Sequence, residues 1–312
     1  MRPTRRRCLA GLTGALAALP ACRRQPQPQV NVGAKTGTEQ AFLAAAIALH
    51  LESVLGPGRA IARPALGGSA VTHETLLASQ IDLYPEYTGL ALTALLGLAS
   101  DPDPAKVLQQ VKANYRIRFR CEWTTPLGFS NPPVLVTTEA IAHELGGLEL
   151  SRAALAKKPW RLGAQREFLG RRDGLPMLMA AYKLPLSGPV QTMERDQLYA
   201  ALDIGQITLA AGEALDPGAR RPGMAILTDD HHAFPPYEAG LAVSLDILER
   251  LPGLLAALKP LEGRFPFGRL ARAIDEIERA AAAARENPEA PPPDLRAFAR
   301  GFLREAGLHP PQ

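Results

Sequence analysis

The sequence predicts an α/β fold, and three observations carry this prediction. Short apolar runs alternate with segments whose apolar residues recur at helical spacing through the first third of the chain. The chain has 312 residues, which is enough for one large domain or for two lobes with sizeable cores. Hydrophobic residues make up 46% and charged residues 21% of it, as in globular rather than disordered proteins.

The first part of the chain shows this alternation most clearly. Thr36-Gly37-Thr38-Glu39 has the spacing of a capping box and predicts a helix start, and Gly56-Pro57-Gly58 predicts its end. Pro85 is expected to end a strand, and Thr88 to start a helix. The expected elements are strands at 30–34, 60–66 and 81–84, and helices at 36–55, 70–79 and 88–98.

The remainder predicts a second lobe and a helical end. Pro132-Pro133 interrupts the chain between two predicted strands, and we interpret this stretch as a crossover between lobes, with a return near residues 229–237. The expected elements are strands at 118–123, 134–137 and 161–164, and helices at 104–115, 138–144, 151–157, 173–182, 245–258, 269–285 and 293–306.

The amino-terminal residues are interpreted as an export signal. A basic start at residues 5–7 precedes an apolar stretch at 8–19 that is too short to anchor the chain across a bilayer. The net charge is +4, and residues 1–21 hold four arginines and no acidic residue, so the rest is neutral. A neutral mature chain has no general electrostatic reason to bind nucleic acid.

Leu19-Pro20-Ala21-Cys22 resembles a lipoprotein processing site, so residues 1–22 are expected to be a lipoprotein-type signal that ends at an acylated Cys22. An ordinary cleaved peptide and a twin-arginine route stay open. Residues 23–29 then form a polar, proline-rich tether. Because Cys8 leaves with the signal, Cys121 stays alone, which excludes an internal disulfide and a cysteine metal cluster.

Catalytic signatures are lacking. The adjacent His231 and His232 cannot both face one metal ion from a strand, and the neighbouring Asp229 and Asp230 do not complete a site. The sequence has no nucleophile elbow, zinc-protease motif or phosphate loop. We therefore expect no enzyme, no cofactor and no metal site.

Six segments together resemble the solute-binding proteins of osmoprotectant-type ABC importers, which take up glycine betaine, carnitine, choline and related amines. They occur in the family's order, and the third and sixth are long and unusual. The segments are V-G-A-K-T-G-T-E-Q at 32–40, L-G-G-S at 66–69, I-D-L-Y-P-E-Y-T-G at 81–89, L-G-F-S-N at 127–131, E-F-L-G-R-R-D-G at 167–174 and D-D-H-H-A-F-P-P-Y at 229–237.

The resemblance implies a type II periplasmic-binding-protein fold, in which two lobes joined by two crossover segments close over a ligand. Lobe 1 would comprise residues 30–130 and 230–312, and lobe 2 residues 131–229. The protein would be a monomer in the periplasm or on the outer face of the membrane, and would deliver a small amine to a permease and its ATPase. A ligand-binding sensor that signals to a membrane receptor would have the same fold, and this alternative stays open.

The resemblance also implies a cage of tyrosines around a quaternary ammonium, held by cation–π attraction. Tyr87 and Tyr237 keep two cage positions, whereas Pro133 and Glu213 stand where relatives carry aromatic residues. Half of the cage is therefore expected to be missing. Glu213 would favour a cation that donates hydrogen bonds, unless it is only solvated at the rim.

A zwitterionic ligand also needs its carboxylate held. Lys35 and Arg171 offer charge, and Thr38 and Ser69 lie at expected helix starts that favour anions. Ordinary surface charge and simple helix capping are the alternatives for these four residues. Thr88 and Asn131, in the third and fourth segments, complete the expected ligand-binding set.

Overall fold

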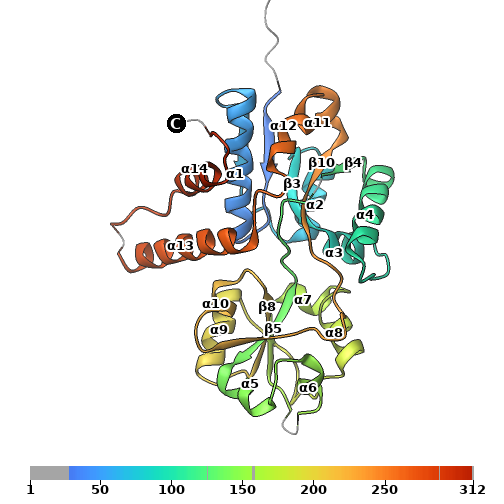
Figure 1. The fold of residues 1–312 in the computed structure, drawn as a ribbon, viewed down its shortest axis with the longest axis vertical. Helices are drawn as coiled ribbons and strands as arrows, with labels where there is room; N and C mark the ends of the chain where they lie inside the picture. Colours follow the sequence, from blue (N-terminus) through green and yellow to red (C-terminus); the bar gives the residue numbers. More distant parts are fainter. Residues whose placement is uncertain (1–27, 125, 157–158, 288, 311–312) are drawn as a thin grey trace, which may run out of the picture.

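The computed structural model describes residues 28–310 except 125, 157, 158 and 288. Two five-stranded sheets, each flanked by helices, lie one above the other along the long axis of the molecule (Figure 1). The two-lobed α/β fold expected from the sequence is therefore confirmed. The export signal, Cys22 and nearly all of the expected tether lie outside the described residues. No helix in the described ranges is long and apolar enough to cross a membrane.

The first lobe is built on a sheet with the order β2-β1-β3-β10-β4. β1 runs parallel to β2 and β3, whereas β10 runs antiparallel to β3 and β4. The carboxyl ends of β1 and β3 therefore meet at one edge, where ligand sites of α/β sheets occur. The strands are β1 Val30–Gly33, β2 Ala60–Arg63, β3 Leu83–Tyr87, β4 Cys121–Trp123 and β10 Ala239–Ser244.

Helix α1 forms the centre of this lobe's core. Its side chains from Phe42 to Leu51 are buried, and the Phe42 ring meets the Phe302 ring of α14 edge-on, with centroids 5.3 Å apart. The helices are α1 Thr38–Leu55, α2 Ser69–Leu77, α3 Thr88–Leu90, the π-helical η1 Ala91–Leu95, α4 Pro104–Phe119, α11 Leu245–Arg250, α12 Leu254–Leu258, the 3₁₀ turn η2 Lys259–Leu261, α13 Phe267–Glu286 and α14 Leu295–Glu305.

The second lobe is built on a sheet with the order β7-β6-β8-β5-β9. β5 is antiparallel to β8, and their register sets Pro133 opposite Glu213. The two positions at which we expected cage aromatics to be missing are therefore neighbours. The elements are β5 Pro133–Thr138, α5 Glu139–Leu145, α6 Leu150–Ala154, β6 Leu162–Ala164, α7 Arg166–Gly170, α8 Leu175–Tyr182, β7 Gln191–Thr192, α9 Arg195–Asp203, β8 Leu209–Glu213, α10 Pro217–Arg220 and β9 Met224–Leu227.

Two crossover segments join the sheets, one between β4 and β5 and one between β9 and β10 (Figure 1). They pair with each other, because the Asn131 backbone N–H donates to the Tyr237 carbonyl at 3.1 Å and Ser130 bridges to Glu238. Asn131 and Tyr237 are thus fixed next to each other between the lobes. The predicted lobe limits after residues 130 and 229 fall within these segments.

Several expected boundaries were wrong. β3 was expected to stop at Pro85 but continues to Tyr87. Pro85 lies opposite Leu241 of β10, but the backbone N–H and carbonyl of Leu241 form hydrogen bonds with Thr124 instead. On the other side of β3, β1 pairs only with Leu83. The N–H that proline lacks would therefore face no neighbouring strand.

Other differences follow from helix length and burial. The strand expected at 118–123 begins at Cys121, because α4 continues to Phe119 and ends at Arg120 in a left-handed conformation. The single helix expected at 245–258 is broken around Pro252, as proline in a helix interior requires. The expectation did not include β10, a fully buried run without polar alternation.

The close packing of β10 gives a prediction. A Cβ added to Gly240 would stand 2.5 Å from Trp123 Nε1, against a fully buried indole. Gly240→Ala should therefore lower the free energy of unfolding by about 1–3 kcal/mol, measured by denaturant titration. Gly301→Ala in α14 is the control, since nothing lies within 4 Å of that Cβ and alanine favours a helix. Equal stability of the two variants would contradict this packing.

Candidate functional site

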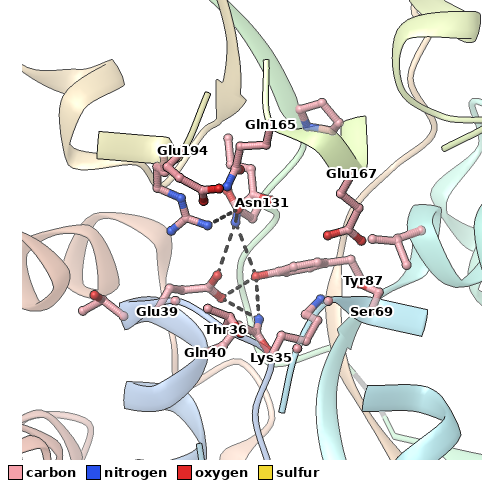
Figure 2. A pocket seen from close by; sticks show the side chains of 18 of the residues that line it. Lys35, Thr36, Glu39, Gln40, Ser69, Tyr87, Asn131, Gln165, Glu167 and Glu194 are labelled. Atoms are coloured by element: carbon pink, nitrogen blue, oxygen red, sulfur yellow. Dashed lines mark hydrogen bonds and ion pairs between the residues drawn. The ribbon is translucent and has the colours of Figure 1, made fainter. Parts of the chain in front are cut away.

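A cavity of about 530 Å³ lies between the two lobes and receives side chains from both (Figure 2). Every residue of the expected ligand-binding set lines it except Thr88. The Thr88 hydroxyl donates to the Pro236 carbonyl at 2.9 Å and accepts from the Glu238 N–H at 3.1 Å. Thr88 thus ties β3 to the second crossover segment and does not face the cavity.

Tyr87 forms an aromatic wall of the cavity. It is the last residue of β3, and its ring lies edge-on to Phe129 and tilted to Tyr237, with centroids 6.3 and 6.4 Å apart. Its hydroxyl donates to Glu39 (Figure 2). Tyr87 is 4% exposed and lines the cavity between the lobes.

One face of the Tyr87 ring already carries a cation. The Lys35 ammonium lies 4.4 Å from the ring centroid and 2.6 Å from Glu86 Oε1. Glu86 is fully buried and also accepts from the Tyr87 N–H at 2.8 Å. Lys35 is therefore part of a buried ion pair, and ordinary surface charge does not describe it.

Glu39 lies at the centre of the cavity, although its sequence pattern predicted only a capping role. The helix start was correctly expected, but the N-cap is Gly37, without a side-chain cap, and Glu39 is directed into the cavity. It also accepts from Gln40 Nε2 at 3.2 Å. Burial and the negative charge of Glu213 raise the pKa of Glu39 to about 7, against the opposing effect of the Tyr87 hydrogen bond.

Asn131 links the carboxylates of the two lobes. Its Oδ1 accepts from the Leu215 N–H at 2.9 Å, which directs its Nδ2 toward the cavity. Nδ2 lies 3.1 Å from Glu213 Oε2, 3.3 Å from the Tyr87 hydroxyl and 3.4 Å from Glu39 Oε2 (Figure 2). The site therefore holds two carboxylates around one amide that has only two hydrogens to donate.

Arg195 partly balances these carboxylates, and no motif in the sequence indicated it. It is the first residue of α9, and its Nε lies 3.2 Å from Asp216 Oδ1 while its Nη2 lies 3.9 Å from Glu213 Oε2. Asp216 is itself held by the Tyr199 hydroxyl at 2.7 Å and by the Glu213 N–H at 3.0 Å. Glu213 is therefore part of a network, although its side chain is 32% exposed.

Of the remaining expected residues, three already have side-chain partners among the described residues and one does not. Arg171 Nε lies 3.1 Å from Asp173 Oδ1, and the Tyr237 hydroxyl donates to the same carboxylate. The Thr38 hydroxyl donates to Glu278 of α13. Ser69 is 4% exposed and, within the described part of the chain, its hydroxyl has no hydrogen-bond partner.

The cavity carries an excess of negative charge. Three of its cations are neutralised by buried carboxylates behind the wall, which pair Lys35 with Glu86, Arg171 with Asp173 and Arg195 with Asp216. The lining cations are Lys35, Arg166, Arg171, Arg195 and Arg285, and the lining carboxylates are Glu39, Glu167, Glu194, Asp196, Glu213 and Glu278. Such a cavity is suited to a cationic guest.

The aromatic wall is one-sided. Tyr87 comes from the first lobe and Tyr237 from the second crossover segment. Among the described residues of the second lobe, no aromatic side chain lines the cavity, and its wall there includes Pro133 and Glu213. The arrangement can thus surround a cation with two rings and several carboxylate oxygens, but not with a complete aromatic cage.

Comparison with known proteins finds matches over most of the chain. Residues 28–288 match the family model for the substrate-binding domain of ABC-type glycine betaine transport systems. An ergothioneine transport permease/ergothioneine binding protein of Helicobacter pylori is 28% identical over 254 residues, which cover 81% of this chain and 45% of that protein. A glycine-betaine-binding protein of Pseudomonas aeruginosa is 26% identical over 312 residues, or 97% of this chain and 96% of that one.

A carnitine transport binding protein of Listeria monocytogenes is 26% identical over 249 residues, which cover 79% of this chain and 80% of that protein. The crystal structure of a glycine betaine/carnitine/choline ABC transporter superposes with a TM-score of 0.72 at 23% identity, over 90% of this chain and 99% of that chain. At this identity the structural likeness shows the fold alone.

The Glu39 carboxyl gives a prediction on pH. Its pKa is about 7 in the folded chain and 4.5 ordinarily, so between these values the folded state binds more protons than the unfolded state. Stability must then fall as pH rises through this window. Relative to Glu39→Gln, the wild type should lose on the order of 2–3 kcal/mol of unfolding free energy between about pH 5 and pH 8.

Denaturant titrations at several pH values measure this difference. Glu276→Gln, at an exposed position on α13, is the matched control and should keep the wild-type slope. A Glu39→Gln variant whose stability follows the wild type at every pH would show that this carboxyl titrates normally.

Proposed function

Because the chain belongs to the family of substrate-binding domains of ABC-type glycine betaine transport systems, we propose that it captures a cationic or zwitterionic amine between its lobes. It is the substrate-binding component of an osmoprotectant-type importer and works with a permease and an ATPase. Such components bind and release their solute without chemical change. We further propose that it acts as a monomer outside the cytoplasmic membrane, anchored through a lipid on Cys22.

One observation carries the proposed ligand class, namely that Tyr87 shares the cavity with the carboxylates of Glu39 and Glu213. Relatives are described as binding ergothioneine, carnitine or glycine betaine. A trimethylammonium group has no N–H to donate, so it depends on aromatic faces. Here two of the expected faces are replaced, whereas carboxylate oxygens are available to N–H donors. We infer a preference for an amine that carries N–H groups.

The opposite end of the cavity would hold a carboxylate if the ligand has one. Ser69 offers an unpaired hydroxyl at the start of α2, and Arg171 offers the part of its guanidinium that does not face Asp173. Lys35 and Thr38 line the same wall, but the Lys35 ammonium is already paired with Glu86 and the Thr38 hydroxyl with Glu278. We therefore assign the anion chiefly to Ser69 and Arg171, with Lys35 adding positive charge.

The first test of this function is a calorimetric ligand panel. The panel contains glycine betaine, choline, carnitine, ergothioneine and a polyamine, titrated into the purified wild-type chain. We expect at least one cation with N–H donors to bind more tightly than glycine betaine, because the cage is incomplete. Sub-micromolar binding of glycine betaine would contradict the inferred divergence, and no binding of any amine would contradict the function itself.

Two substitutions of Glu213 distinguish the effect of its charge on ligand affinity from the effect of its position in the cavity wall. Glu213→Gln should lower the affinity for the N–H-bearing cation about tenfold, because one charge-assisted hydrogen bond is lost. Glu213→Tyr should raise the affinity for glycine betaine by roughly 2–30-fold, since one added ring contributes about 0.5–2 kcal/mol of binding free energy. Glu144→Gln, at an exposed position on α5 outside the cavity, is the control. Equal effects on both ligands would show that Glu213 only adds diffuse charge.

A further inference from the structure

The Glu167 carboxylate crosses from the second lobe to the amino-terminal end of helix α2. A Cβ built on Gly68, the N-cap of α2, would stand 2.9 Å from Glu167 Oε2 and 3.4 Å from Oε1. In Figure 2 the Glu167 side chain extends from the second lobe into the cavity on the side of Tyr87 and Ser69. A negative group of the chain itself therefore lies where a ligand carboxylate is expected.

The start of α2 is poorly satisfied by its own residues. It has no side-chain cap and no acidic residue in its first turn, so its exposed N–H groups and the positive end of its dipole face the cavity. Ser69 is 4% exposed, lines the cavity, and has an unpaired hydroxyl within the described residues. An unpartnered buried hydroxyl beside free N–H groups is a site for an anion.

Glu167 is placed to fill this site from α7. It lies one helical turn before Arg171, with 4.0 Å between Oε1 and Nη1, so it also takes part of the positive charge of that guanidinium. Its side chain is 46% exposed, which leaves it room to turn away. The same carboxylate thus approaches Gly68, the residue before Ser69, and Arg171, so it lies beside both groups to which the proposed function assigns the ligand's anion.

We propose that Glu167 determines specificity by acting as a resident carboxylate at the anion end of the cavity. A cation without a carboxylate leaves Glu167 in place on α2. A zwitterion must displace it, which costs the interaction with α2 and brings two carboxylates close together. The chain therefore discriminates in favour of amines that lack a carboxylate. This inference rests on the proposed function, because it supposes that the cavity binds amines.

Glycine betaine and choline form a matched pair of probes, since both carry a trimethylammonium group and only the former has a carboxylate. Calorimetry on the full chain gives their affinity ratio. Glu167→Gln should raise the ratio of glycine betaine to choline affinity about tenfold, because the freed N–H groups and Ser69 can then receive the ligand's carboxylate. Adding Ser69→Ala to Glu167→Gln should reverse most of that gain and leave the affinity for choline unchanged.

Glu144→Gln removes one negative charge from an exposed position on α5 of the same lobe, which does not line the cavity, so it should leave the ratio within about twofold. Melting curves confirm that each variant is folded. An unchanged or lowered ratio in Glu167→Gln overturns the inference while the proposed function stands. If the wild type binds neither these probes nor any other amine, the proposed function fails and the inference fails with it.

Discussion

The hydrogen bond from the Tyr87 hydroxyl to Glu39 organises the site. It joins the end of β3 to the first turn of α1, so the aromatic wall and the buried carboxylate have a fixed relation. Asn131 then adds a crossover segment to this pair and, through Glu213, the second lobe. Three separate parts of the chain thus meet at one phenol–carboxylate contact, and the cavity takes its shape from them.

Arginines of the second lobe also reach the first lobe around the cavity. The Arg195 guanidinium of the second lobe approaches Gly37, where a Cβ would lie 3.3 Å from Nη1 and where φ is +125°. The Arg172 Nη1 donates to the Gly97 carbonyl of the first lobe at 3.1 Å. On the other flank, Arg220 of α10 holds Asp275 of α13 with two hydrogen bonds of 2.7 and 3.1 Å. The lobes are therefore held together by polar contacts around the rim, while the centre keeps its excess of carboxylates.

The sequence predicted what depends on local pattern. Strand–helix alternation and the motif around Tyr87 located the first lobe and its aromatic wall, because both are written in consecutive residues. Glu39 was misjudged because an acidic residue three positions after a threonine at a helix start is the same signal whether it caps or faces a cavity. Arg195 and β10 depend on partners far along the chain, at Asp216 and at β3 and β4, and no local pattern specifies such pairings.

The excess of carboxylates around the cavity would make closure over a ligand selective in itself. When the lobes exclude water, an unpaired carboxylate loses its hydration, and the cost exceeds that of an unfilled apolar surface. Glu39 reduces this cost by holding its proton near neutral pH, but Glu213 and Glu167 are partly exposed and stay in contact with water. A cationic guest replaces the lost hydration at the cation end, whereas a neutral or anionic guest leaves it unreplaced. Under the proposed function, selection for cations would therefore come from the penalty on the wrong complex as well as from cation–π attraction, and a site with an incomplete aromatic cage could still bind amines specifically.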